Sequence, residues 1–155
     1  MSGGGYPNYS NDENQYRPGK ILIVEDHLDI LKMFRIFWDS KGYETLTEKN
    51  ALNLMKVCLE DKPDVIILDV GLPYRDLTDV YSELRGDTQT RQIPIIFVIP
   101  KDSETSEWEK IQALGLGAKD GIFEVSDFDG IVKSVEEALP PNRRPSGNVL
   151  WQADD

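Results

Sequence analysis

Three carboxylates stand directly after two apolar segments of this sequence. Glu25 and Asp26 follow the segment 21–24, and Asp69 follows the segment 65–68. If both segments are neighbouring strands of a parallel sheet, their carboxyl ends meet at one edge and the three acids converge there. Carboxylates at such short range repel one another, and a hard divalent cation such as Mg²⁺ removes that repulsion. With the cation bound, the Asp69 carboxylate is a candidate nucleophile toward a phosphodonor, because aspartyl phosphate is an established covalent intermediate.

The elements that would position these acids alternate along the chain. Short apolar segments predict strands, and apolar residues at helical spacing between them predict helices. The predicted strands are 21–24, 43–47, 65–68, 95–99 and 121–123. The predicted helices are 28–41, 50–61, a stripe over 77–84, 103–114 and a stripe over 128–139. This alternation predicts an α/β fold: a doubly wound, five-stranded parallel sheet of the flavodoxin type, with strand order 2-1-3-4-5 and helices on both faces.

One domain, residues 19–139, is predicted between two tails. Residues 1–18 contain no Val, Ile, Leu or Phe. Such a segment cannot bury enough apolar area to offset the entropy lost on ordering, which predicts a disordered tail. Residues 140–155 begin with two prolines, which end a helix, so a tail or linker is predicted there. Its apolar cluster, 149–151, either docks on the domain, contacts a partner or is the remainder of a longer parent sequence.

The composition excludes several classes of partner. The chain of 155 residues has 28 acidic and 17 basic residues, a net charge of -11. It therefore has no basic excess for nucleic-acid phosphates or for an anionic membrane surface. No apolar run approaches the roughly 20 residues of a membrane span, and no signal peptide is recognisable, so the cytoplasm is the expected compartment. Cys58 is the single cysteine, which excludes an intrachain disulfide and predicts a small apolar helix residue.

Four segments of the sequence carry a resemblance to a known family: KILIVEDH, PDVIILDVGLP, TRQIPIIF and GLGAKDGIF. Over roughly residues 20–139, the chain resembles the response-regulator receiver family, which includes the CheY-like proteins. The resemblance implies that Glu25 and Asp26 hold Mg²⁺ together with Asp69. It also implies that the backbone carbonyl of Gly71 completes the metal shell and that Asp69 accepts phosphate from a histidine kinase.

The chain departs from the family pattern at three switch positions. Where the family has a Thr or Ser at the end of the fourth strand, this chain has Ile99, which is followed by Pro100 in place of the usual Ala. Ile99 has no hydroxyl to donate to a phosphoryl oxygen. Where the family has a Lys at the end of the fifth strand, this chain has Glu124, whose charge has the same sign as a phosphoryl group. The position of the family's aromatic switch residue is Gly121, which has no ring to move.

Two other residues near the acids have alternative roles. Lys101, two positions beyond Ile99, is either a solvated loop residue or a compensating cation that reaches Asp69 or Glu124. His27, the only histidine, directly follows the acidic pair. We expect it to be a surface residue, with metal binding as the alternative. A nucleotide-binding enzyme on the same fold is not expected, because the sequence after the first strand, VEDHLD, is acidic and has no glycine-rich phosphate loop.

These observations lead to two functional hypotheses. In the first, the chain is an atypical response regulator receiver, a pseudo-receiver that acts through protein–protein interaction. In the second, it is a functional Mg²⁺-dependent phosphotransfer receiver that accepts phosphate at Asp69. Neither makes it an enzyme beyond self-phosphorylation and dephosphorylation at Asp69. The expected partner is a histidine kinase, a phosphotransfer protein or a constitutive protein partner, and a homodimer could form through the fourth and fifth helices. No output domain follows residue 139, so the chain either contacts a partner or is a fragment of a longer regulator.

Overall fold

The sheet has five parallel strands. The computed structural model describes residues 17–73, 75–101 and 105–145. Its strands are β1 (Lys20–Val24), β2 (Glu44–Glu48), β3 (Val65–Asp69), β4 (Ile95–Ile99) and β5 (Gly121–Glu124). They are ordered β2-β1-β3-β4-β5, with every neighbouring pair parallel. The doubly wound α/β fold and the strand order expected from the sequence are therefore confirmed.

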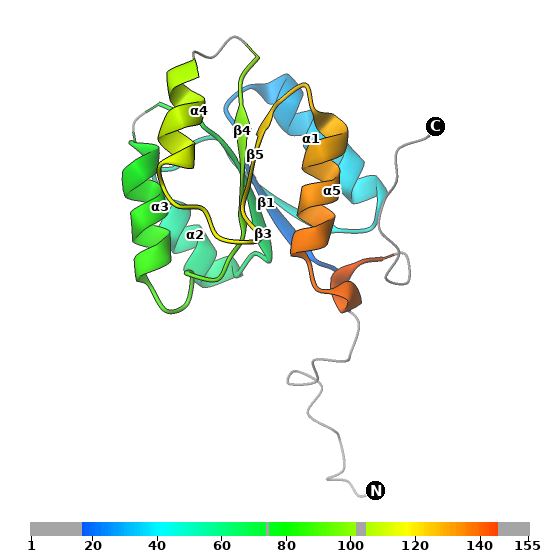
Figure 1. The fold of residues 1–155 in the computed structure, drawn as a ribbon. Coiled ribbons are helices and arrows are strands. Elements are labelled where there is room, and N and C mark those ends of the chain that lie inside the picture. The colour runs from blue at the N-terminus through cyan, green and yellow to red at the C-terminus, as the bar shows by residue number, and fades with distance from the viewer. Residues whose placement is uncertain (1–16, 74, 102–104, 146–155) are drawn as a thin grey trace, which may run out of the picture.

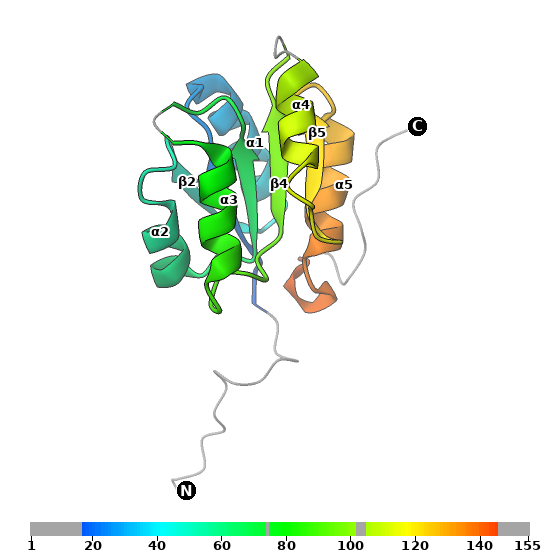
Figure 2. The ribbon, with the colours of Figure 1, turned by 60° about the vertical axis from the view of Figure 1, so that its left-hand side comes forward.

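Helices cover both faces of this sheet (Figures 1 and 2). The helices are α1 (Leu28–Ser40), α2 (Leu54–Asp61), α3 (Leu77–Gly86), α4 (Thr105–Gln112) and α5 (Phe128–Ala138). Helices α1 and α5 lie on one face, and α2, α3 and α4 lie on the other. None of the helices in the described ranges has the length and apolarity that a membrane crossing requires.

The central strands β1, β3 and β4 are almost entirely apolar because helices cover both of their faces, whereas the edge strands β2 and β5 are only partly buried. In β1, Leu22 and Val24 pack into the core under α2, α3 and α4, whereas Ile21 and Ile23 pack into the core under α1 and α5. All four of these side chains are fully buried. Strand β3 is buried along its whole length, its terminal Asp69 included. A carboxylate at the end of such a strand therefore starts from an apolar, water-poor environment.

Two helices differ from the expected bounds by more than one residue. Helix α2 was expected from residue 50 but begins at Leu54. The Asn50 side chain accepts a hydrogen bond from the Leu52 backbone N–H at 2.9 Å, and this local turn competes with helical geometry. Helix α4 was expected over 103–114 but ends at Gln112, close to Gly115 with its positive φ of 73°. Residues 103 and 104 lie outside the described residues.

The segment after α5 packs against the domain. Pro140 ends the helix as expected, and the short 3₁₀ helix η3 (Pro141–Arg143) follows. The Arg144 guanidinium donates to two carbonyls of the α5 C-terminus, those of Glu136 and Leu139, at 3.0 Å each. The Gly19 N–H donates to the Arg143 carbonyl at 3.1 Å. These bonds hold 140–145 against the domain. Residues 1–16 and 146–155, with the apolar cluster 149–151, lie outside the described residues.

The buried carboxylate of Asp120 connects α3 to the first residue of β4, Ile95. The Asp120 side chain is 2% exposed and accepts four hydrogen bonds. Its Oδ1 accepts from the Arg85 guanidinium at 2.7 Å and from the Ile95 N–H at 2.8 Å. Its Oδ2 accepts from the Tyr81 hydroxyl and from the Gly117 N–H, both at 2.9 Å. This carboxylate thus joins α3, β4 and the loop before β5.

We expect Asp120→Ala to lower the free energy of unfolding by about 3–5 kcal/mol, because it leaves a partly buried guanidinium and two backbone N–H groups without their acceptor. Urea denaturation measures this loss. The control is Glu60→Ala, which removes an exposed ion pair with Lys56 and should change stability by less than about 0.5 kcal/mol. Equal effects of the two substitutions would contradict the structural role of Asp120.

Candidate functional site

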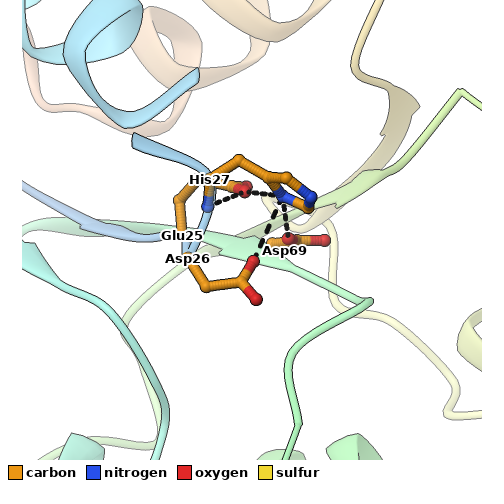
Figure 3. Close-up of side chains that lie close together, drawn as sticks. All are labelled: Glu25, Asp26, His27 and Asp69. Atoms are coloured by element: carbon orange, nitrogen blue, oxygen red, sulfur yellow. Dashed lines mark hydrogen bonds and ion pairs between the residues drawn. The ribbon is translucent and has the colours of Figure 1, made fainter. Parts of the chain in front are cut away.

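The structure brings four side chains together at the carboxyl ends of β1 and β3. The two strands are neighbours, with Val24 opposite Leu68, so the residues that follow each strand meet at one edge. One ligand atom each from Glu25, Asp26, His27 and Asp69 lies within 4.8 Å of all the others. Figure 3 shows these four side chains turned toward one another. The three acids that the sequence placed at this edge therefore lie together, and His27 joins them.

Asp69 has one oxygen held by the backbone and one without a donor. Its side chain is 2% exposed. Its Oδ1 accepts a hydrogen bond from the Gly71 N–H at 2.8 Å. Its Oδ2 is buried and has no hydrogen-bond partner among the described residues. A buried acceptor without a donor is costly, and the cost is greater for a charged group. A divalent cation bound by these oxygens would remove that cost, so the donor set fits a hard, oxygen-ligated ion.

The pKa of Asp69 reflects this environment. Burial is the main cause that raises the pKa of its carboxyl from 3.8 to about 7, and the charges of Glu25 and Asp26 add to the rise. The hydrogen bond from the Gly71 N–H acts in the opposite direction. Near neutral pH, the ionised carboxylate therefore costs the folded chain free energy that a bound cation would offset.

His27 turns one ring nitrogen into the site although most of its side chain is exposed. Its Nδ1 lies 2.8 Å from Glu25 Oε1, 3.2 Å from Asp26 Oδ1 and 3.9 Å from Asp69 Oδ2. The His27 backbone N–H donates to the same Glu25 oxygen at 3.1 Å. The hydrogen bond with Glu25 and the charge of Asp26 raise the pKa of the imidazole. The expectation of a simple surface residue was therefore incomplete.

Gly71 is exposed, but its Cα approaches Asp69 and Pro100 closely on one side. A Cβ atom at Gly71 would lie 3.2 Å from the Pro100 Cγ and 3.4 Å from Asp69 Oδ1. Glycine is therefore the residue that lets the loop after β3 approach the carboxylate closely enough for its N–H to donate. The sequence identified Pro100 only as a departure from the family pattern, and its contact with this loop was missed.

The replaced switch positions lie apart from the cluster or offer it no polar group. Ile99 is 4% exposed and packs in the core beneath α2, α3 and α4. Glu124, at the end of β5, is exposed and is not one of the four clustered residues. Lys101 is exposed, and within the described ranges it forms no ion pair with Asp69 or Glu124. Its role as a compensating cation thus has no contact to support it here.

At the aromatic switch position, neighbouring side chains occupy the space. A Cβ atom on Gly121 would lie 2.8 Å from Phe123 Cε2 and 2.9 Å from Ser134 Oγ. Both separations are shorter than real Cβ contacts, so a larger residue here requires its neighbours to move. The Phe123 and Ser134 side chains therefore fill the space that a side chain at position 121 would need.

Comparison with known proteins identifies the family. The response regulator receiver domain family matches residues 21–136. The polar-differentiation response regulator DivK of Brucella anthropi is 36% identical over 81 residues, which cover 52% of this chain and 66% of DivK. The transcriptional regulatory protein KdpE of Mycobacterium tuberculosis is 30% identical over 122 residues, which cover 79% of this chain and 51% of KdpE. The chain thus spans about half the length of some relatives that it matches, such as KdpE.

Solved structures agree with this assignment. The chemotaxis response regulator CheY4 of Vibrio cholerae has the same fold, with a TM-score of 0.63 and 21% identity over 79% of this chain and all of that one. The receiver domain of a histidine kinase from Syntrophus aciditrophicus has a TM-score of 0.67 and 26% identity over 78% of this chain and 89% of that one. The chain belongs to the response regulator receiver domain family of two-component signalling.

Proposed function

We propose that this chain is an atypical receiver that acts through protein–protein interaction, with Asp69 as its potential phosphoacceptor. The observation that carries the proposal is an incomplete site. The acidic half is assembled around Asp69, whose Oδ2 has no hydrogen-bond partner among the described residues. The other half lacks both groups that would hold a phosphoryl group, because Ile99 is apolar and Glu124 is an exposed acid.

Glu25, Asp26, Asp69 and the backbone carbonyl of Gly71 are the groups that would hold Mg²⁺ in this proposal. When bound, the ion would neutralise carboxylate charge and the charge of a phosphoryl oxygen. Weak binding is expected from a site that is solvated on the side of Asp26, whose side chain is 35% exposed. The clustered carboxylates and the orphaned oxygen support this assignment.

The chain's own contribution to phosphorylation is the orientation of Asp69. The Gly71 N–H holds Oδ1, which leaves Oδ2 as the nucleophile. Attack by Oδ2 forms the new oxygen–phosphorus bond, and the phosphodonor's leaving group departs with the electron pair of the bond that breaks. A functional Mg²⁺-dependent phosphotransfer receiver is the second candidate, and the donor-free Oδ2 favours it.

In this proposal, phosphorylation of Asp69 does not change the surface that binds the partner. A ligand shifts a two-state equilibrium only through different contacts with the two states. Ile99 cannot donate a hydrogen bond to a phosphoryl group, and Gly121 has no aromatic ring that could move in response to phosphorylation. A partner on α4, β5 and α5 should therefore bind with an affinity that phosphorylation changes by less than about tenfold, or about 1.4 kcal/mol.

The partners belong to the same proposal. They are a histidine kinase or phosphotransfer protein, or a constitutive protein partner, met in the cytoplasm. Nucleic acid and membrane are not proposed as partners, given the net charge of -11. The proposal also includes a homodimer, in which a second copy of the chain binds through α4 and α5.

We expect Asp69→Asn to stabilise the metal-free chain increasingly as the pH rises. The carboxyl pKa is raised by folding, so its penalty is absent below the unfolded value near 3.8, grows between there and about 7, and is complete above about 7. At pH 8 the gain should lie between about 1 and 4 kcal/mol, and at pH 4 it should be close to zero. Saturating Mg²⁺ should reduce or reverse the gain.

Urea denaturation in chelator at pH 4, 6 and 8 measures this difference. The control is Glu137→Gln, which neutralises an exposed acid on α5 and should change stability by less than about 0.5 kcal/mol at every pH. Marked destabilisation by Asp69→Asn at pH 8 would mean that the carboxylate makes a structural contact.

We also expect Glu124→Lys to strengthen binding of beryllofluoride in the presence of Mg²⁺ at least tenfold. An ammonium group at this position can neutralise the anion's charge, whereas the carboxylate repels it. Titration followed by amide chemical shifts around Asp69 measures the affinity. Glu137→Lys makes the same change in net charge on α5 and should alter the affinity less than twofold. Equal gains in both variants would show that net charge alone is responsible.

A further inference from the structure

The imidazole of His27 occupies the N-cap position of α1 without capping the helix. Its backbone is extended, as is usual for an N-cap residue, but its side chain makes no capping hydrogen bond. Ser, Thr, Asp and Asn are the residues that cap helices effectively. The His27 Nδ1 is directed instead at the carboxylates of Glu25, Asp26 and Asp69 (Figure 3). The ring therefore belongs to the acidic cluster and does not cap the start of the helix.

The spacing of the four groups fits a shared ion. Ligands about 2.1 Å from an ion lie at most about 4.2 Å from one another. The His27 Nδ1 lies 2.8, 3.2 and 3.9 Å from the nearest oxygens of Glu25, Asp26 and Asp69, all within that limit. The widest separation in the cluster is below 4.8 Å, so a small contraction completes the set.

A second observation points to a ligand at the same place. Asp69 Oδ2 is one of the two buried side-chain polar atoms that lack a hydrogen-bond partner in the described part of the chain. It lies 3.9 Å from the His27 Nδ1, at a separation that a hydrogen bond does not span. An ion between the imidazole and this oxygen would give Oδ2 a partner and would replace the hydrogen bond between the His27 Nδ1 and Glu25.

We propose that His27 is a metal ligand through Nδ1 and that it makes this cluster selective for divalent transition metals over Mg²⁺. The proposal shares its carboxylates with the proposed Mg²⁺ site but adds a nitrogen ligand to it. Mg²⁺ takes oxygen ligands and retains waters, whereas Mn²⁺, Co²⁺ and Zn²⁺ accept imidazole nitrogen together with carboxylate, with affinity rising along that series. In such a complex, Nδ1 gives its lone pair to the ion and Nε2 carries the ring proton, on the exposed side.

The experiment uses Co²⁺, Zn²⁺ and Mg²⁺ with the full chain in a form without a histidine tag. The absence of a tag matters because His27 is the only histidine in the sequence. Calorimetric titrations compare the unmodified chain with His27→Ala. The Co²⁺ and Zn²⁺ affinities should fall at least tenfold in the variant, and the Mg²⁺ affinity should change less than twofold. Co²⁺ should also produce paramagnetically shifted imidazole proton signals, which His27→Ala abolishes.

Two control variants separate the possible outcomes. Leu28→Ala alters the exposed neighbouring residue at the start of α1 and should leave all three affinities within twofold. Asp69→Asn should weaken both Co²⁺ and Mg²⁺ binding, because the two ions share its oxygen. Co²⁺ binding that depends on His27 but not on Asp69 would indicate an isolated surface histidine and would overturn the proposal.

The proposal and the proposed function fail in different ways. If His27→Ala leaves the Co²⁺ and Zn²⁺ affinities unchanged while Mg²⁺ still binds at Asp69, the nitrogen ligand is excluded and the Mg²⁺ site stands. If no divalent ion perturbs the amide signals around Asp69 at millimolar concentration, the nitrogen ligand and the proposed Mg²⁺ site are both overturned, and only the proposed interaction surface is left.

Discussion

The pairing of β1 with β3 is the constraint on which the site depends. It sets Val24 beside Leu68, so the chain leaves both strands at the same edge. Mutually repelling carboxylates are then held close together by two central strands, β1 and β3, which are buried on both faces of the sheet. Folding of the apolar core therefore stabilises an electrostatically unfavourable arrangement. The pKa of Asp69 is raised mainly by burial in that core and further by the charges of Glu25 and Asp26.

Much of this arrangement could be predicted because it depends on periodicity. Alternating strands and helices fix the sheet order, and the sheet order brings Asp69 to Glu25 and Asp26. What the sequence could not provide is the direction of individual side chains. His27 could equally have pointed to solvent, since only the absence of a capping bond and the short distances to three acids place its Nδ1 in the cluster. The close approach of Pro100 to Gly71 brings two loops together, and the sequence of neither loop predicts it.

Local hydrogen bonds account for the errors at the element boundaries. The turn made by Asn50 delays α2, although Asn before a helical pattern is a usable sign of such a turn. The prolines at 140 and 141 correctly end α5, but they do not reveal that Arg144 returns to the carbonyls at the end of that helix. In the sequence alone, a cation shortly after a helix C-terminus is compatible with either arrangement.

The packing around Gly121 limits how readily an aromatic residue can be introduced at this position. The space that a Cβ atom needs is taken by the Phe123 ring and the Ser134 hydroxyl, one from the same strand and one from α5. Gaining an aromatic residue at this position by a single substitution would therefore meet two neighbours that must both move. The Ser134 hydroxyl can turn away by a change of rotamer, so the Phe123 ring on the same strand is the main obstacle to an aromatic residue at this position.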